Sequence, residues 1–222
     1  MFGSPTASPL SWYNDLRMMR DNGLDMFENL QFTPPEYTFS EKQQRQIDAL
    51  IQLSQRFGLP YMAGLLIGQN VAVEDAELAK QAEMCRQFAA RYKNTPGLIY
   101  YLNGDFTLNL KDTPDVRRLW NDFLRTRYGT DEALQKAWAS RTPEAPIGQL
   151  PVKDYPAGKW YDVPARDVTA FRSELVKRWV NALCTAVRQQ DKEHPITSEY
   201  YQRPVDGIDL RLTLGDMDAA NI

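Results

Sequence analysis

Apolar residues along the chain alternate between short strand-like runs and stretches with helical spacing. The strand-like runs cover 24–30, 60–67 and 97–102, and the second is nearly continuous, as expected for a strand buried on both faces. Helical patterns at 41–57 and 74–92 lie between them. The strand starts at 24, 60 and 97 are 36 and 37 residues apart, the length of one strand–helix unit. Repeated units of this kind predict an α/β fold with a parallel sheet.

Capping residues mark where several helices begin. Ser40 to Gln43 forms a capping box ahead of the helix at 41–57, and Ser11 is the expected cap of an earlier helix that stops near Asn22. Thr113, followed by proline, and Thr130 each begin a short helix.

The regular spacing breaks after Asp105. We interpret 106–164 as an insertion over one end of the sheet, followed by a long helix from Ala165, a short strand at 196–199 and the start of another at 216–222. Residues 1–10, rich in serine and proline, are expected to form a flexible segment ahead of one domain at 11–222.

Two architectures alternate strands and helices in this way, the doubly wound sheet and the (β/α)8 TIM-type barrel. The long insertion and the polar residues at the strand ends favour the barrel, in which such loops carry function. A complete barrel needs about 250 residues. The chain provides only five or six strands by this count, so we expect a partial barrel with its helical insertion after the fourth barrel strand.

Composition narrows the chemistry. The 222 residues carry 26 Lys+Arg against 29 Asp+Glu, a net charge of −3, which disfavours nucleic acid as a partner. There is no apolar run of about 18 residues and no signal-peptide pattern, so we expect a soluble protein without a membrane partner. The sequence does not indicate its cellular compartment. One histidine, two cysteines and no glycine-rich phosphate loop predict no metal and no cofactor. Carboxylate chemistry remains.

Polar and aromatic residues gather at the predicted carboxyl ends of the strands. The polar residues are Glu28, Asn29, Gln69, Asn70, Asn103, Asp105, Glu199, Asp216 and Asp218, and the aromatic ones are Tyr100, Tyr101, Phe106, Tyr200 and Tyr201. Such a rim suits a sugar, which offers hydroxyls to bond and C–H faces to stack. The alternative is that strand ends are polar simply because they meet water.

Four segments resemble one enzyme group. They are Tyr-Tyr-Leu-Asn-Gly-Asp at 100–105, Leu-Trp-Asn-Asp-Phe-Leu at 119–124, the Arg-Tyr-Gly-Thr…Ala-Trp block at 127–138, and Asp-Lys-Glu-His-Pro-Ile-Thr at 191–197. The first resembles the fourth-strand end of clan A retaining glycoside hydrolases, and the others are similar to family 42 β-galactosidases. The block at 127–138 is the most specific, and its expected role is packing in a two-helix cap.

This resemblance implies hydrolysis of a β-galactoside or related β-glycoside. The family's fourth strand ends in Asn-Glu, whereas here Asn103 is followed by Gly104 and then Asp105. Asp105 becomes the candidate acid/base if Gly104 bends the chain, and Asn103 the contact to the sugar 2-hydroxyl. The family's nucleophile lies on the seventh strand, which we expect outside this chain.

Further substrate contacts are expected from strand-end side chains, namely Glu28, Tyr101, Glu199 and Tyr200. Other residues have simpler structural interpretations. His194 stands at a strand entry away from the barrel mouth, and Cys85 and Cys184 lie on helix faces as buried apolar residues.

Two alternatives to an active glycosidase stay open. One is a catalytically silent barrel that still binds carbohydrate, favoured by the missing Asn-Glu pair. The other is a scaffold whose cap helices form a homo-oligomer interface.

Overall fold

The computed structural model describes residues 8–29, 33–139, 141–153, 162–199, 208–209, 211 and 216–221. They contain one parallel sheet whose strands lie in chain order. The strands are β1 (Phe27–Asn29), β2 (Tyr61–Ile67), β3 (Leu98–Gly104), β4 (Ile196–Glu199) and β5 (Ala219–Asn221). A doubly wound sheet reverses its strand order at a switch point. Unbroken sequential order is what the wall of a barrel shows, so the structure confirms the partial-barrel prediction.

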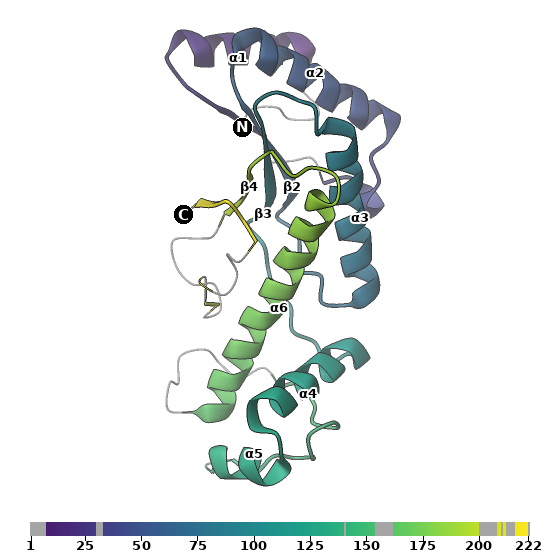
Figure 1. The fold of residues 1–222 in the computed structure, drawn as a ribbon, viewed down its shortest axis with the longest axis vertical. Coiled ribbons are helices and arrows are strands. Elements are labelled where there is room, and N and C mark those ends of the chain that lie inside the picture. The colour runs from purple at the N-terminus through teal and green to yellow at the C-terminus, as the bar shows by residue number, and fades with distance from the viewer. Residues whose placement is uncertain are drawn as a thin grey trace.

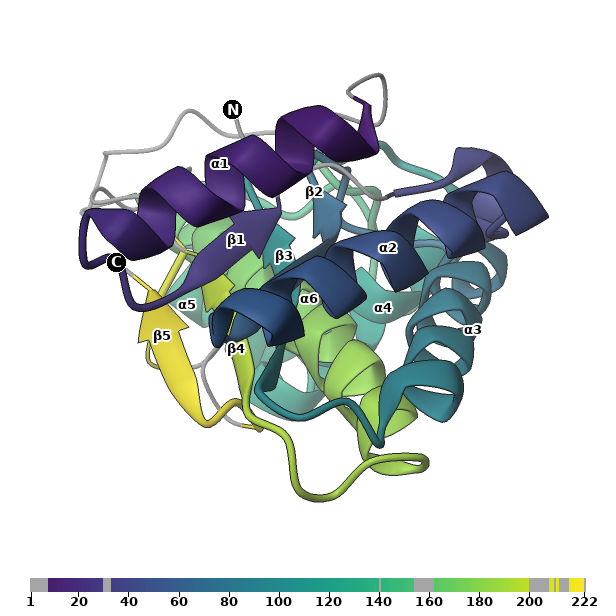
Figure 2. The ribbon, with the colours of Figure 1, turned by 90° about the horizontal axis from the view of Figure 1, so that it is seen from above.

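Helices alternate with the strands as the sequence predicts (Figures 1 and 2). They are α1 (Pro9–Asp21), the 3-10 turn η1 (Pro35–Tyr37), α2 (Glu41–Phe57), α3 (Asp75–Tyr92), α4 (Pro114–Tyr128), α5 (Asp131–Ala137) and α6 (Val163–Arg188). In the described part of the chain, no helix combines the length and apolar character needed to cross a bilayer.

Local capping explains where α1 and α2 begin. At α2 the predicted capping box is confirmed, because the Ser40 hydroxyl accepts from the Gln43 backbone N–H and the Gln43 side chain accepts from the Ser40 backbone N–H. The prediction for α1 was wrong by one turn. Ser8, not Ser11, is the N-cap, and it accepts from the backbone N–H of Ser11 at 3.2 Å. Pro9 then occupies the first helical position, where its missing N–H costs nothing.

Helices α3 and α6 pack against one face of the sheet (Figure 1). Tyr100 of β3 lies edge-on to Phe88 of α3, with ring centroids 6.2 Å apart. Just beyond β3, Phe106 lies edge-on to Trp179 of α6 at 5.6 Å. Because successive side chains in a strand point to opposite faces, Tyr101 and Asn103 lie on the other face, which we call the inner face.

The helices α4 and α5 lie at the far end of α6, away from most of the sheet (Figure 1). The Trp120 ring of α4 stacks on Phe123 at 5.6 Å, and it also contacts Trp138 at 6.4 Å and Phe171 of α6 at 5.2 Å. These helices follow β3, the third strand of the described sheet. The sequence-based prediction placed them after the fourth barrel strand, which is the number of this strand in the family that the sequence resembles. That they cover a barrel mouth, and that they form an oligomer interface, stay predictions.

Candidate functional site

The carboxyl ends of the parallel strands lie along one edge of the sheet. Leu66 of β2 is in register with Asn103 of β3, and Tyr101 of β3 is in register with Thr197 of β4. Extending the second pairing by two residues places Asn103 level with Glu199. The structure therefore brings the predicted positions on β3 and β4 to the same edge.

Three predicted contact residues share the inner face of the sheet. Glu28 is in register with Met62, and Met62 with Ile99, which lies two residues before Tyr101 and on the same face. Tyr101 and Asn103 are fully buried, whereas Glu28 is half-buried. Both Glu28 and Tyr101 have further interactions within the protein.

Asn103 is the most unusual residue of this group. Its side chain has 0% exposure, and neither its Nδ2 nor its Oδ1 has a hydrogen-bond partner in the described structure. A buried amide without partners costs about 1–3 kcal/mol for each unsatisfied group. An orphaned side chain of this kind is typical of a site where a ligand or another segment supplies the missing partners.

Asp105 lies directly after β3 and is exposed. The prediction that Gly104 bends the chain was wrong in its detail. Gly104 stays in the strand, and Asp105 itself adopts the left-handed conformation with φ of +49°. Aspartate tolerates this conformation better than most residues. The bend is fixed on its far side, because Thr107 forms a parallel bridge with Asn70.

Other predicted rim residues lie elsewhere. Tyr100 and Phe106 belong to the helix-facing core, and the Tyr100 hydroxyl donates to Asp191 at 2.7 Å. Asp218 precedes β5, so it lies at the amino end of the sheet, where its carboxylate accepts from the Ile196 backbone N–H at 2.7 Å. Asp216 precedes the same strand.

Three predicted rim residues lie wholly or partly outside the described residues. The backbone of Glu199 ends β4, but its side chain lies outside the described residues, as do Tyr200 and Tyr201 entirely. Asn29 is buried and makes interactions of its own, and Asn70 accepts from the Thr107 hydroxyl and from Asn109 Nδ2, the latter at 3.1 Å.

The opposite edge of the sheet holds a carboxylate network centred on Asp191. Its Oδ2 accepts from the Tyr100 hydroxyl and pairs with His194 Nδ1 at 2.7 Å, and its Oδ1 accepts from the backbone N–H groups of Glu193 and His194. Burial alone would raise the pKa of Asp191, but these hydrogen bonds outweigh it and lower the pKa to about 2. The structural interpretation of His194 is confirmed, because it helps to fix the entry to β4.

The motif block at 127–138 converges on a residue that the sequence did not single out. Asp167 of α6 has 0% exposure and accepts from the Tyr128 hydroxyl at 2.6 Å and from Trp138 Nε1 at 2.7 Å. Arg127 forms an ion pair with the same carboxylate at 2.9 Å. The block therefore fastens α4 and α5 to α6, which confirms its predicted packing role.

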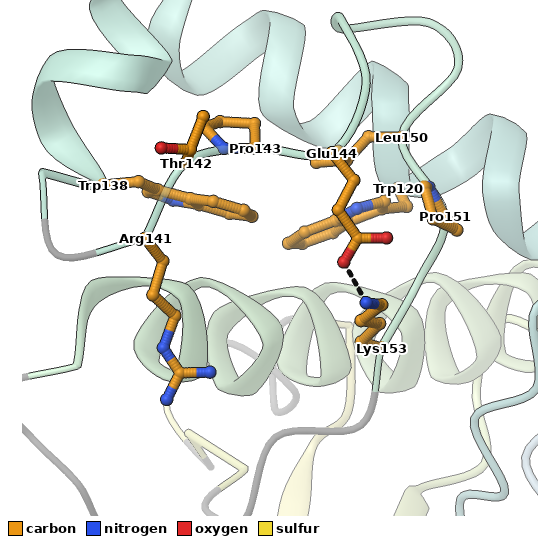
Figure 3. A pocket seen from close by; sticks show the side chains of 9 residues that line it. All are labelled: Trp120, Trp138, Arg141, Thr142, Pro143, Glu144, Leu150, Pro151 and Lys153. Atoms are coloured by element: carbon orange, nitrogen blue, oxygen red, sulfur yellow. Dashed lines mark hydrogen bonds and ion pairs between the residues drawn. The ribbon is translucent and has the colours of Figure 1, made fainter.

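A pocket of about 180 Å³ lies beside this contact (Figure 3). The Trp120 and Trp138 rings line it, and the Glu144–Lys153 ion pair stands at one side. Both indoles are almost fully buried, at 1% and 4% exposure, and pack within the helical insertion. The pocket is a gap in the packing of the helical insertion. Across the described residues, no cluster of histidine, cysteine or acidic side chains could hold a metal ion.

The fold matches solved structures of β-galactosidases. One from the psychrophilic Marinomonas ef1 superposes with a TM-score of 0.75 at 15% identity, covering 97% of this chain and 39% of that chain. One from Bacillus circulans sp. alkalophilus gives 0.74 at 14% identity, covering 96% and 38%. A catalytic mutant of a GH42 β-galactosidase from G. stearothermophilus gives 0.75 at 16% identity, covering 96% and 37%.

At these identities the likeness shows the fold alone. No protein-family model matches the chain, and no curated protein matches it by sequence. The chain spans less than two fifths of the length of the structures that it matches. It therefore has the fold of part of a glycoside hydrolase barrel, and the resemblance drawn from the sequence is confirmed at that level.

Proposed function

We propose that the protein acts on a β-galactoside or a related β-glycoside at the carboxyl edge of its sheet. The observation that carries this proposal is Asn103, a fully buried amide with no hydrogen-bond partner in the described structure, on the inner face of β3. The similar solved structures are β-galactosidases, which supports the substrate class. Asn103 would bond the sugar 2-hydroxyl, a contact that strengthens in the transition state of glycoside hydrolysis. Because the Asn103 side chain is fully buried, a sugar can reach this amide only when the groups that surround it move aside.

Asp105 is the proposed acid/base. It is exposed, follows Asn103 by two residues and lies at the carboxyl end of β3. An acid here would protonate the leaving oxygen as the glycosidic bond breaks, and as a carboxylate it would then activate water. Retaining hydrolysis needs a second carboxyl group about 5–5.5 Å away. We place that nucleophile outside residues 1–222, with Glu28, Tyr101, Glu199 and Tyr200 as substrate contacts.

The test replaces Asp105 in the full-length protein and compares two aryl β-galactosides. Asp105→Asn removes the acid but keeps a residue that tolerates the left-handed backbone. Loss of general acid catalysis lowers kcat/KM by about 10²–10⁴-fold for a phenyl leaving group, which needs protonation. The 2,4-dinitrophenolate leaving group needs little protonation, so kcat/KM for this second substrate should fall far less.

The matched control is Asp25→Asn, which changes an exposed aspartate just before β1, at the other edge of the sheet. It should leave both substrates unaffected. Equal turnover by Asp105→Asn and the parent on the phenyl substrate would end the assignment of Asp105.

A catalytically silent carbohydrate-binding barrel is the second candidate. Gly104 follows Asn103 directly, at the position where the family that the sequence resembles has its acid/base glutamate. Glycine in place of this glutamate favours the silent barrel. Calorimetry with galactose decides between the two. Heat of binding that depends on Asn103, without hydrolysis of either aryl substrate, would select the silent barrel.

A further inference from the structure

A second pocket, of about 290 Å³, lies beside the carboxyl ends of β2 and β3. We propose that it binds a further hexose unit of a β-linked oligosaccharide, which would make the substrate a glycan chain rather than a single glycoside. The inference rests on the proposed function, because it extends the same rim, but the lining of this pocket is separate from Asn103 and Asp105.

The lining of this pocket combines an apolar floor with polar walls. Val71, Ala72, Val73 and Val116 are buried and supply the floor. Hydrogen-bonding groups surround it, namely those of Tyr37, Asn70, Glu74, Glu77, Asn109 and Lys111. Amides, carboxylates and an ammonium above apolar carbon suit a sugar, which has C–H faces and a ring of hydroxyls.

The lining carries charged groups of both signs, because two carboxylates, Glu74 and Glu77, and one ammonium, Lys111, border the same pocket. Glu74 already accepts from the Thr113 hydroxyl, which holds one carboxylate in place. A sugar hydroxyl can donate to a carboxylate and accept from an ammonium, so a ring of hydroxyls can bond both kinds of group at once.

The wall formed by Tyr37 is held rigidly. Buried Gln81 donates to the Tyr37 hydroxyl at 3.1 Å, and Gln81 itself accepts from Trp179 Nε1 at 2.6 Å. Burial, together with a hydrogen bond to Glu77, raises the pKa of Tyr37, so the hydroxyl stays protonated. Tyr37 and Glu36 both adopt left-handed backbone conformations, with φ of +54° and +51°. Strain of this kind persists where the surroundings impose it, and it is common at ligand clamps.

The pocket is connected to the proposed acid/base through the backbone. Thr107, two residues after Asp105, bridges to Asn70, and Asn70 accepts from Asn109. Asn70 and Asn109 both line the pocket. The bridge between Asn70 and Thr107 therefore joins the segment that carries Asp105 to the segment that forms one wall of the pocket.

The test is calorimetry with D-galactose and with β-1,4-galactotetraose on the full-length protein carrying Asp105→Asn, so that the sugar chain is not hydrolysed during the titration; this protein is the parent of the comparison. The variant is Asn109→Ala with Lys111→Ala, two exposed side chains whose loss leaves the core intact. We expect the parent to bind tetraose at least tenfold more tightly than galactose. We expect the double variant to lose that advantage while its affinity for galactose stays unchanged.

The matched control is Lys93→Ala with Asn94→Ala, an exposed pair at the other end of α3, which should change neither affinity. Equal affinity of the parent for both sugars, or an unchanged tetraose affinity in the Asn109/Lys111 variant, overturns the pocket proposal. Failure of the proposed function looks different: Asn103→Ala then leaves galactose binding unchanged, whatever happens with tetraose.

Discussion

Trp138 Nε1 donates a hydrogen bond of 2.7 Å to the carboxylate of Asp167, across 29 residues of chain. Tyr128 donates to the same oxygen, and Arg127 pairs with the carboxylate. Because Asp167 is completely buried, this one side chain connects three residues of the helical insertion to α6. A buried carboxylate is tolerated only when its charge is paired and hydrogen-bonded in this way.

Asp167→Ala is therefore expected to destabilise the protein strongly. It removes the acceptor of the buried Trp138 N–H and of the half-buried Tyr128 hydroxyl, and each of these hydrogen bonds to a charged group contributes about 1.5–3 kcal/mol. Trp138→Phe keeps the ring but removes one donor to a charged acceptor, so it should cost about 1.5–3 kcal/mol. Urea denaturation measures both. Asp122→Ala, at an exposed position in α4, is the control and should stay within about 0.5 kcal/mol of the parent. Equal stability of Asp167→Ala and this control would contradict the prediction.

A second prediction concerns Asn121, which holds the segment that follows α5. Its Oδ1 accepts from the backbone N–H groups of Gly148 and Leu150, at 2.7 and 3.1 Å, and its Nδ2 donates to the Leu150 carbonyl at 2.9 Å. Asn121→Ala removes these bonds from a buried site and should cost about 2 kcal/mol. Hydrogen exchange should speed up at the amides of Gly148 and Leu150 first. Unchanged exchange at these two amides would show that Asn121 does not hold the segment.

A third prediction is the acid sensitivity produced by Asp191. Its folded-state pKa of about 2 lies below the ordinary value of about 3.9, so the unfolded chain binds more protons as the solution becomes acidic. The resulting stability is fully present above about pH 4 and is lost as the pH falls toward 2. Its size is about 2 kcal/mol.

Denaturation curves between pH 6 and pH 2 test this dependence. Over this range the parent should lose about 2 kcal/mol more than Asp191→Asn, which has no carboxyl to titrate. Tyr100→Phe removes one hydrogen bond that lowers the pKa of Asp191, so the stability lost between pH 6 and pH 2 should be smaller than in the parent. Parallel curves for the parent and Asp191→Asn would rule out this role of Asp191.

These networks show where the sequence was informative and where it was not. The capping box at Ser40 and the apolar strands β2 and β3 are local signals, and the structure has them where they were predicted. The sequence could not predict which face of the sheet Tyr100 lies on. Residues on both faces of β3 are mostly buried, so the alternation of side chains along the strand does not indicate which face meets the helices. Asp167 was missed because its partners lie 29 and 39 residues away.

The place of the predicted residues in the sheet followed from the sequence more closely than their local geometry did. Glu28, Asn103 and the backbone of Glu199 lie at the carboxyl edge, as parallel pairing requires. Asp218 was misplaced because β5 has only three residues, Ala219–Asn221, so the residues taken for its end lie before its start. The left-handed backbone of Asp105 is followed two residues later by the Asn70–Thr107 bridge, a contact that no local pattern reveals.

The last prediction separates stability from function at Asn103. Leucine has the branched shape of asparagine, with larger methyl groups, and needs no hydrogen bonds, so Asn103→Leu removes the desolvation cost of a buried amide whose atoms have no partner among the described residues. We expect the variant to be as stable as the parent or up to about 1–3 kcal/mol more stable, and to lose galactose binding. Asn103→Ala, which leaves a cavity instead, should lose binding and stability together. Chemical denaturation and calorimetry on the same samples measure both properties. Unchanged galactose binding by both Asn103→Leu and Asn103→Ala would end the binding role assigned to the amide.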